Sequence, residues 1–288
     1  MKLILLFFIG LLQLFFIKEN LATSQQNWDI EYLKLSYAAY CPPPDLLAWN
    51  CTFCQPSQQI VDVIENIETD NLAITTIDKE NSRINLVFRG SHSIKNFIQD
   101  IQFLKSDIEL DGLDGVYVAS GFYKAYMALA DRIAVSLDNI LASNQGINQV
   151  YISGHSLGAS MSAIAAIDLK QRLGYNIVGS YTYGSPRVGN VDFSELYQKL
   201  IGNTKRFTNN ADIVPHLPPI LFGFRHVLRE SWLNGTTIID CSPDNSEDPS
   251  CSDNVSVLNY NVADHLNYFG IEENCIEQYL EWKQRQNI

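Results

Sequence analysis

A serine placed between two glycines carries the clearest chemical signal in this sequence. The segment Gly154-His155-Ser156-Leu157-Gly158 follows a short apolar run and precedes a stretch of small residues. A serine on a sharp turn between a strand and a helix has a strained backbone, and side chains two positions away on either side would collide with the crossing chain. The two glycines therefore predict such a turn, with Ser156 exposed on it as a nucleophile.

The residues after this turn predict a helix that begins beside Ser156. Residues 159–166 are Ala-Ser-Met-Ser-Ala-Ile-Ala-Ala, which are small enough to let a helix lie close to a sheet. Free N–H groups and the helix dipole favour negative charge at a helix start. The N–H of Leu157 is therefore a candidate donor to the oxyanion that forms when a nucleophile attacks a carbonyl.

A serine hydroxyl is a weak nucleophile without an adjacent base, so a histidine is required. The chain has five histidines, His92, His155, His216, His226 and His265. Hydrolases built around this turn carry the acid after the serine and the histidine last, which leaves the final three. We predict His265, which follows the last acid-rich loop, and keep His216 and His226 as alternatives. His155 is interpreted as structural because its ring points away from the neighbouring hydroxyl.

Asp212 is the predicted acid that orients this base. It lies in the loop 209–216, directly after a predicted strand at residues 205–208. Enzymes built on such sheets present their sites where the strands end. Asp264 is a rival because it precedes His265, but adjacent residues rarely orient each other's side chains as the chemistry requires. A solvated loop aspartate is the simpler alternative for Asp212.

The surrounding pattern predicts the elements that must position these residues. Apolar strand-like runs alternate with helical patterns, the former at residues 72–77, 84–88, 149–153, 177–183 and 205–208, the latter at residues 121–141, 159–173 and 192–201. This alternation is typical of an α/β fold in which helices cover a mostly parallel central sheet. A chain of 288 residues without internal repeats suits one domain, which we expect over residues 23–288.

The first 22 residues are predicted to be a secretory signal peptide. Lys2 precedes a nearly unbroken apolar run over residues 3–17, and small and polar residues follow it. The run is shorter than the roughly 20 residues that span a bilayer, although a retained signal anchor is the alternative. No later stretch is as apolar. We therefore expect no transmembrane segment and a protein secreted into an extracellular, secretory or digestive compartment.

Charge and cysteines narrow the class of protein further. The formal net charge of −12 argues against nucleic acid as a partner and against electrostatic docking on anionic lipid. An even number of cysteines in a secreted chain predicts disulfides; the six are Cys41, Cys51, Cys54, Cys241, Cys251 and Cys275. A Cys241–Cys251 bridge could hold the polar loop 241–254. The single Cys-x-x-Cys pair lacks clustered histidines, so no metal and no cofactor is expected.

Three sequons predict N-glycosylation if the chain enters the secretory route, at Asn50, Asn234 and Asn254. Asn50 is the weaker of the three because the middle position of its sequon is itself a cysteine.

Three further segments carry a resemblance to a known family. They are Phe88-Arg-Gly-Ser-His-Ser-Ile-Lys-Asn-Phe-Ile-Gln-Asp100, Tyr183-Gly-Ser-Pro-Arg-Val-Gly-Asn190 and Asp212-Ile-Val-Pro-His-Leu-Pro-Pro219. With the serine turn, they make the chain resemble the class 3 lipases, the fungal-type triacylglycerol lipases, from about residue 37 to residue 275. The resemblance implies the α/β-hydrolase fold, and Ser156, Asp212 and His265 match the family triad position by position.

The resemblance also assigns roles around the triad. Ser91 would be the second oxyanion donor, and Asp100 would help to orient it. The implied disulfides are Cys41–Cys275, Cys51–Cys54 and Cys241–Cys251. Residues 93–102 match the family's lid, a short helix that covers the site until an oil surface opens it.

One apolar stripe runs along this lid segment. Ile94, Phe97, Ile98 and Ile101 fall at i, i+3, i+4 and i+7. The same spacing would suit an ordinary core helix, so the lid assignment depends on the family position. Many family members carry tryptophan where this chain has Phe97, which leaves the strength of activation at an interface open.

The function implied is hydrolysis of carboxylic esters of acylglycerols by a secreted, monomeric serine lipase. The ester is cleaved through an acyl-enzyme on Ser156, and the substrate is a lipid or ester at an oil–water interface. A phospholipase A1 or a feruloyl-type esterase of the same family is the alternative, because acyl specificity depends on pocket shape. A catalytically silent binding protein on the same fold is a further alternative.

Overall fold

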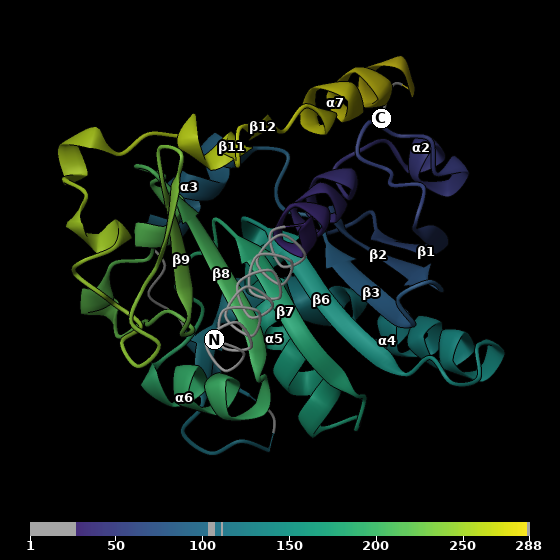
Figure 1. Ribbon diagram of the computed structural model, residues 1–288, viewed down its shortest axis with the longest axis horizontal. Helices are drawn as coiled ribbons and strands as arrows, with labels where there is room; N and C mark the ends of the chain where they lie inside the picture. Colours follow the sequence, from purple (N-terminus) through teal and green to yellow (C-terminus); the bar gives the residue numbers. More distant parts are fainter. Residues whose placement is uncertain (1–26, 103–106, 111, 287–288) are drawn as a thin grey trace, which may run out of the picture.

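A computed structural model describes residues 27–102, 107–110 and 112–286. The predicted signal peptide lies outside the described residues. Eight strands form one sheet in the order β1-β2-β3-β6-β7-β8-β9-β10 (Figure 1). Their bounds are β1 Gln59–Asn66, β2 Asn71–Asp78, β3 Arg83–Phe88, β6 Gln149–His155, β7 Ile177–Tyr183, β8 Asn203–Asn209, β9 Glu230–Asn234 and β10 Thr237–Asp240.

The centre of this sheet is parallel and its two edges are antiparallel. Strands β3, β6, β7, β8 and β9 pair in parallel, whereas β1, β2 and β10 join by antiparallel pairing. The sequence pattern predicted the parallel centre, but β1, β9 and β10 fell outside the predicted runs. Strand β10 is mostly exposed and β1 only half-buried, so neither shows the continuous apolar pattern of a buried strand.

Helices α4 (Ser120–Ser143), α5 (Leu157–Gln171) and α6 (Val191–Leu200) pack on one face of the sheet. Residues 27–38, also helical, cover the other face with an aromatic layer in which Tyr32 stacks on Tyr181 at 4.4 Å. Successive strand residues point to opposite faces, so Ile152 joins the first core and Tyr151 the second. The result is a helix–sheet–helix arrangement, as expected for the α/β-hydrolase fold.

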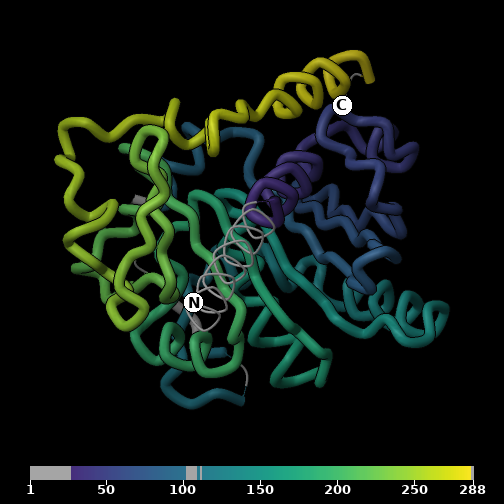
Figure 2. The backbone as a smooth tube through the Cα atoms, viewed as in Figure 1, coloured from purple at the N-terminus to yellow at the C-terminus, as the bar shows by residue number. Residues whose placement is uncertain are grey.

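The remaining elements surround the edge of the sheet where its parallel strands end. They are α2 Pro43–Ala48, α3 Ile94–Gln102, β4 Asp107–Glu109, β5 Tyr117–Ala119, η1 Val214–His216, η2 Ile220–Phe222, η3 Ser252–Asn254, η4 Val257–Asn259, η5 Asp264–Leu266, β11 Asn267–Tyr268, β12 Ile271–Glu272 and α7 Cys275–Gln286. Figures 1 and 2 show the C-terminal segment, in yellow, passing along this edge from η5 to α7.

The disulfides join Cys41 to Cys275, Cys51 to Cys54 and Cys241 to Cys251. This is the pairing that the family resemblance implied. The first bond ties the segment after the N-terminal helix to the start of α7, and the third closes the polar loop after β10. No helix among the described residues combines the length and apolarity needed to cross a membrane.

Candidate active site

The turn that carries Ser156 joins β6 directly to α5. Ser156 has φ 60° and ψ −128°, a left-handed conformation that is strained for any residue except glycine. A β-carbon on Gly154 would lie 2.4 Å from the backbone of Gly158, and one on Gly158 would lie 2.2 Å from the carbonyl oxygen of Phe88. The two glycines are therefore required because α5 crosses β6 and β3 at backbone contact, as the sequence argument predicted.

His265 and Asp212 form a buried pair beside this turn. His265 Nδ1 lies 2.8 Å from Asp212 Oδ2, and neither side chain is more than 1% exposed. The backbone N–H of Val214 donates to Asp212 Oδ1 at 2.9 Å, and Tyr268 Oη donates to Oδ2 at 2.7 Å. Because the carboxylate only accepts, the proton of the imidazole sits on Nδ1. That leaves Nε2 with a free lone pair, the state a general base requires.

The end of β7 lies next to both the turn of Ser156 and the histidine–aspartate pair. The N–H of Ser156 donates to the carbonyl of Tyr183, the last residue of β7. The next residue, Gly184, touches both His265 and Asp212. Ser156 Oγ and His265 Nε2 are buried, and neither makes a hydrogen bond within the described part of the chain. Both reactive atoms are thus shielded from water and left free for a substrate.

Gly184 is a functional residue that the triad prediction did not include. It has φ +59°, and a β-carbon there would lie 2.7 Å from His265 Cε1 and 3.1 Å from Asp212 Oδ2. Only glycine permits the end of β7 to approach the pair this closely. The sequence did offer a signal for Gly184, because it directly follows a predicted strand and belongs to the segment 183–190 that resembles the class 3 lipases.

His155 holds the backbone of the base, in keeping with its structural interpretation. Its Nε2 lies 2.7 Å from the carbonyl oxygen of His265, and its Nδ1 lies 2.9 Å from Tyr40 Oη. The carbonyl can only accept, so Nε2 carries the proton and Nδ1 accepts from Tyr40. Complete burial lowers the pKa of His155 well below its ordinary value and keeps the ring neutral. Tyr40 was not predicted from the sequence.

Asp264, the rival acid, joins two loops rather than orienting the imidazole. Its Oδ2 accepts from the N–H of Ala211 at 3.0 Å and from Asn261 Nδ2 at 2.7 Å. Ala211 precedes Asp212, so this carboxylate fixes the loop of the acid against the loop of the base. The reason given for demoting Asp264, its adjacency to His265, agrees with this geometry.

The two alternative histidines lie in other surroundings. His226 Nε2 lies 2.7 Å from the carbonyl of Pro215, and burial lowers the pKa of His226 well below its ordinary value. His216 stacks on Tyr260 with ring centroids 4.1 Å apart. Neither ring hydrogen-bonds to Asp212 in the part of the chain that the structure describes.

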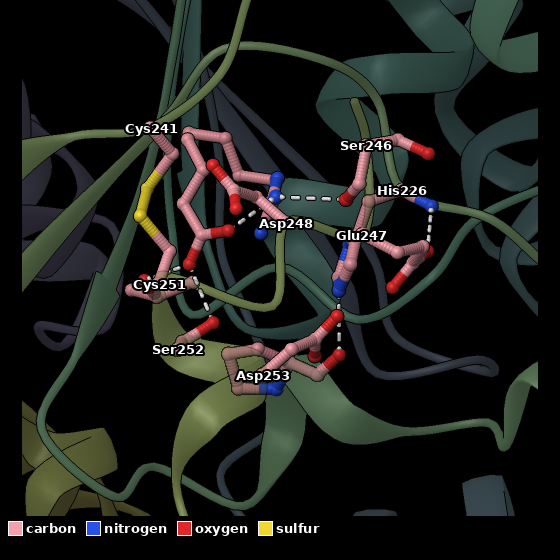
Figure 3. Close-up of polar contacts among 12 residues, drawn as sticks. His226, Cys241, Ser246, Glu247, Asp248, Cys251, Ser252 and Asp253 are labelled. Atoms are coloured by element: carbon pink, nitrogen blue, oxygen red, sulfur yellow. Dashed lines mark hydrogen bonds and ion pairs between the residues drawn. A yellow bond between two sulfur atoms is a disulfide. The ribbon is translucent and has the colours of Figure 1, made fainter. Parts of the chain in front are cut away.

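A polar network links the loop 241–254 with neighbouring segments (Figure 3). Arg187 donates to both carboxylate oxygens of Glu247, at 2.8 to 3.2 Å, and to the carbonyl of Pro218 at 3.2 Å. The Cys241–Cys251 disulfide closes the loop that carries Glu247. Both sulfurs of this bond lie near Asp248, but they are bonded to each other and cannot ligate a metal. The network therefore has a structural purpose.

Ser91 follows β3, the strand next to β6. Phe88, the last residue of β3, pairs with Gly154, so Ser91 emerges on the same edge as Ser156 and Leu157. Ser91 is half-buried, and its Oγ accepts from the N–H of Ser93 at 3.2 Å. This placement suits a second oxyanion donor.

Asp100, which the resemblance implied as the residue that orients Ser91, lies on the outer side of α3. It is exposed on α3, at the rim of a cavity of about 390 Å³ that also contacts Lys124 and Leu157. Among the described residues, no hydrogen bond connects it with Ser91. Its side chain is on the solvent side of α3, away from the apolar stripe, and its role toward Ser91 stays a prediction.

The apolar stripe of α3 packs on the body of the protein next to the segment of Asp212. Ile94 and Ile98 pack with Val214, and Ile101 joins the main hydrophobic core. The Phe97 ring lies 6.4 Å from the ring of Phe122. The helix therefore faces the protein with the side predicted to be apolar, and its role as a lid stays a prediction.

A strained serine turn, a buried histidine–aspartate pair and a helix start at the nucleophile define a serine hydrolase of the α/β-hydrolase fold. The model of the lipase (class 3) family matches residues 85–222. A lipase from Rhizomucor miehei is 33% identical over 261 residues, which are 87% of this chain and 70% of the relative. The chain belongs to the class 3 lipase family.

Other relatives and solved structures agree with this assignment. A lipase from Rhizopus niveus is 31% identical over 87% of this chain and 65% of its own length. A secreted mono- and diacylglycerol lipase A from Penicillium cyclopium is 36% identical over 60% of this chain and 55% of its own. The structure of lipase II from Rhizopus niveus superposes with a TM-score of 0.80 at 28% identity, covering 88% of this chain and 97% of that chain.

Proposed function

We propose that this protein is a secreted serine lipase that hydrolyses the carboxylic esters of acylglycerols. Ser156 is the nucleophile, His265 the general base and Asp212 the group that orients the base. The observation that carries the proposal is the 2.8 Å contact between His265 Nδ1 and Asp212 Oδ2, which leaves the lone pair of Nε2 free to accept a proton. A similar structure, 31% identical with a TM-score of 0.80 over 88% of this chain and 97% of its own, is a triacylglycerol lipase with a serine protease triad.

The reaction proceeds in two stages through an acyl-enzyme. Ser156 Oγ attacks the ester carbonyl while His265 Nε2 takes its proton, and the oxyanion accepts hydrogen bonds from the N–H of Leu157 and from Ser91. Collapse of this intermediate expels the alcohol, which receives the proton from His265. Water then attacks the acyl group with His265 again as base, which releases the acid and restores Ser156.

The surroundings of the site favour an apolar acyl substrate at an oil–water interface. Helix α3 would act as a lid whose stripe, Ile94, Phe97, Ile98 and Ile101, turns toward the oil when the site opens. The cavity beside α3 is lined mostly by apolar side chains and reaches Leu157. The net charge of −12 disfavours an anionic phospholipid surface. We further propose a monomer whose mature domain, residues 23–288, is secreted after removal of residues 1–22.

The decisive experiment compares the mature protein with Ser156→Ala on a triolein emulsion and on a short-chain ester followed across its solubility limit. We expect the rate of ester hydrolysis to rise once the ester exceeds its solubility limit. Ser156→Ala should abolish hydrolysis of both substrates. Ser153→Ala, which removes a second buried serine hydroxyl three residues earlier, is the matched control and should remain active.

Other outcomes would replace the proposal with a specific alternative. Activity confined to dissolved ester indicates a plain esterase, and preferential release of acid from phospholipid vesicles indicates a phospholipase A1. Preferential cleavage of feruloyl esters indicates the feruloyl-type enzyme. Failure of a fluorophosphonate to label Ser156 in folded protein indicates a silent binding protein.

A further inference from the structure

Helix α7 reaches the loop that carries Ser91. Tyr279 of α7 is only 4% exposed, and its ring lies parallel to the ring of His92, with centroids 3.6 Å apart and planes 6° apart. The guanidinium of Arg89 lies 5.4 Å from the centroid of the same Tyr279 ring. Ser91 stands between Arg89 and His92 in the chain, so one aromatic side chain contacts the side chains of residues on both sides of it.

The ring of His92 is held by packing. Its side chain is 5% exposed, and its two nitrogens make no hydrogen bond within the described residues. Asp70 Oδ2 lies 3.7 Å from Nδ1, beyond hydrogen-bond distance, and the Tyr40 ring meets it edge-on at 6.1 Å. Burial lowers the pKa of His92 to about 4, so the stacked ring is neutral at pH 7. Tyr279 is therefore the closer of the two aromatic contacts of this ring.

Ser91 itself has few restraints of its own. Its Oγ accepts one hydrogen bond, from a residue of the same turn, and Asp100 does not hold it. The position of Oγ must then follow from the backbone of residues 89–92. An oxyanion donor acts only when it lies within hydrogen-bond distance of the developing charge, and errors near 1 Å cost much of its effect.

The start of α7 is fixed strongly enough to act as a support. Cys275, the first residue of the helix, is bonded to Cys41. Glu273 accepts from the N–H of Cys275 at 2.7 Å and from that of Ile276 at 3.2 Å. Tyr279 lies one turn further on, so its ring is held relative to the body of the protein.

We propose that Tyr279 is a positioning residue for the reaction, which fixes the oxyanion donor Ser91 by stacking on His92 and receiving Arg89. The proposal rests on the proposed function, because it assumes that Ser91 donates to an ester oxyanion. It assigns to α7 a part in catalysis that acts through the segment of Ser91.

The first test replaces the ring and keeps an apolar side chain. Tyr279→Leu should lower kcat on a dissolved short-chain ester by about tenfold and leave KM within about twofold, since the lost stack stabilises the transition state only through Ser91. Tyr279→Phe retains the stack and should behave as wild type. Glu281→Ala removes an exposed side chain of the same helix and is the matched control. An unchanged kcat in folded Tyr279→Leu would overturn the proposal.

A double-mutant cycle separates positioning from a merely structural effect. Ser91→Ala should lower kcat by about 10²- to 10³-fold. In that background Tyr279→Leu should cause no further loss, because the group that it positions is gone. The same tenfold loss in both backgrounds would show that α7 acts elsewhere. If Tyr279→Leu does not fold, His92→Leu removes the other half of the stack and must show the same pattern.

The rate at which a fluorophosphonate labels Ser156 separates failure of this proposal from failure of the proposed function. Phosphonylation also places an oxygen in the oxyanion hole, so labelling should slow in Tyr279→Leu as hydrolysis does. If the protein does not turn over esters but its labelling still slows in Tyr279→Leu, the proposed lipase function is wrong and the positioning role of Tyr279 stands. If the protein hydrolyses esters but neither kcat nor the labelling rate changes in Tyr279→Leu, the positioning role is wrong and the proposed lipase function stands.

Discussion

The two sides of Ser156 are held in place by different means. On the acid–base side, Asp212 accepts three hydrogen bonds and His265 receives support at both its ring and its carbonyl. On the side of the oxyanion donor, Ser91 Oγ accepts one hydrogen bond within its own turn. The neighbours of Ser91 are fixed by contacts with α7 and with the turn between β1 and β2.

This difference shows which properties each side must control. The acid–base side must keep a proton on Nδ1 and a lone pair on Nε2, and directional hydrogen bonds determine that. The donor side must set a distance, and contacts made by the neighbours of Ser91, the stack on α7 and the ion pair of Arg89 with Asp70, can do so. Substitutions should therefore change the protonation of the base on one side and the placement of a donor on the other.

The largest effect on turnover is expected for Asp212→Asn, which changes the acid on the acid–base side of Ser156. An amide no longer requires the proton to sit on Nδ1, so kcat should fall by about 10⁴-fold with a folded protein. The measurement is kcat on a dissolved ester together with thermal unfolding. Asp264→Asn, which removes the carboxylate that joins the two loops, is the control and should cost far less. A larger loss from Asp264→Asn would reverse the roles assigned to the two acids.

A smaller effect is expected for Tyr268→Phe, which removes one of three donors to the Asp212 carboxylate and keeps the ring. Loss of one hydrogen bond to a charged group should lower kcat by about tenfold. Tyr37→Phe is the matched control, since Tyr37 Oη accepts from the N–H of Tyr268 and does not contact the carboxylate. Equal kcat values for Tyr268→Phe and wild type would show that the remaining two donors are sufficient.

The smallest effect on turnover is expected at Glu273, which lies between the two sides at the start of α7. Burial raises the pKa of this carboxyl to about 7 from its ordinary 4.5. The folded state thus binds this proton more tightly than the unfolded state does. The stability gained from the bound proton is complete below about pH 4.5 and is lost as the pH rises through 7. Above pH 7, the free energy of unfolding of Glu273→Gln should exceed that of wild type by up to about 3 kcal/mol.

The measurement is the free energy of unfolding of wild type and Glu273→Gln between pH 5 and pH 8. Its exposed neighbour supplies the control, because Glu272→Gln should leave the pH dependence of wild type unchanged. If the free energy of unfolding depends on pH in the same way for wild type and Glu273→Gln, the raised pKa of Glu273 is wrong. Turnover of Glu273→Gln at pH 7 should stay close to that of wild type, since the glutamine can still accept from the start of α7.

The sequence predicted those features that local order or spacing determines. The turn at Ser156 follows from two glycines, and its structural reason is the backbone contact at Gly158. The pairing of Asp212 with His265 followed from the order of residue types along the chain. The parallel centre of the sheet followed from alternating strand and helix patterns.

The remaining features depend on which distant segments meet. Tyr40 and Tyr268 reach the site from opposite ends of the chain, and a single buried tyrosine has no local signature. Helix α7 mixes polar and apolar residues and shows its importance only where Tyr279 meets His92. The exposed side of α3, where Asp100 lies, follows from the apolar stripe, but the role of Asp100 toward Ser91 stays a prediction.

The pairing of β3 with β6 has a consequence for how the site can change. Ser91 and Leu157 emerge from neighbouring strands whose backbones are hydrogen-bonded, and such strands lie about 4.8 Å apart in every sheet. The spacing of the two strands is therefore set by backbone geometry, and side chains act on the hole only through the short segment between β3 and α3 that aims Ser91. Substitutions in that segment, or in residues that pack on it such as Tyr279, would tune the second donor while the strands keep a constant spacing.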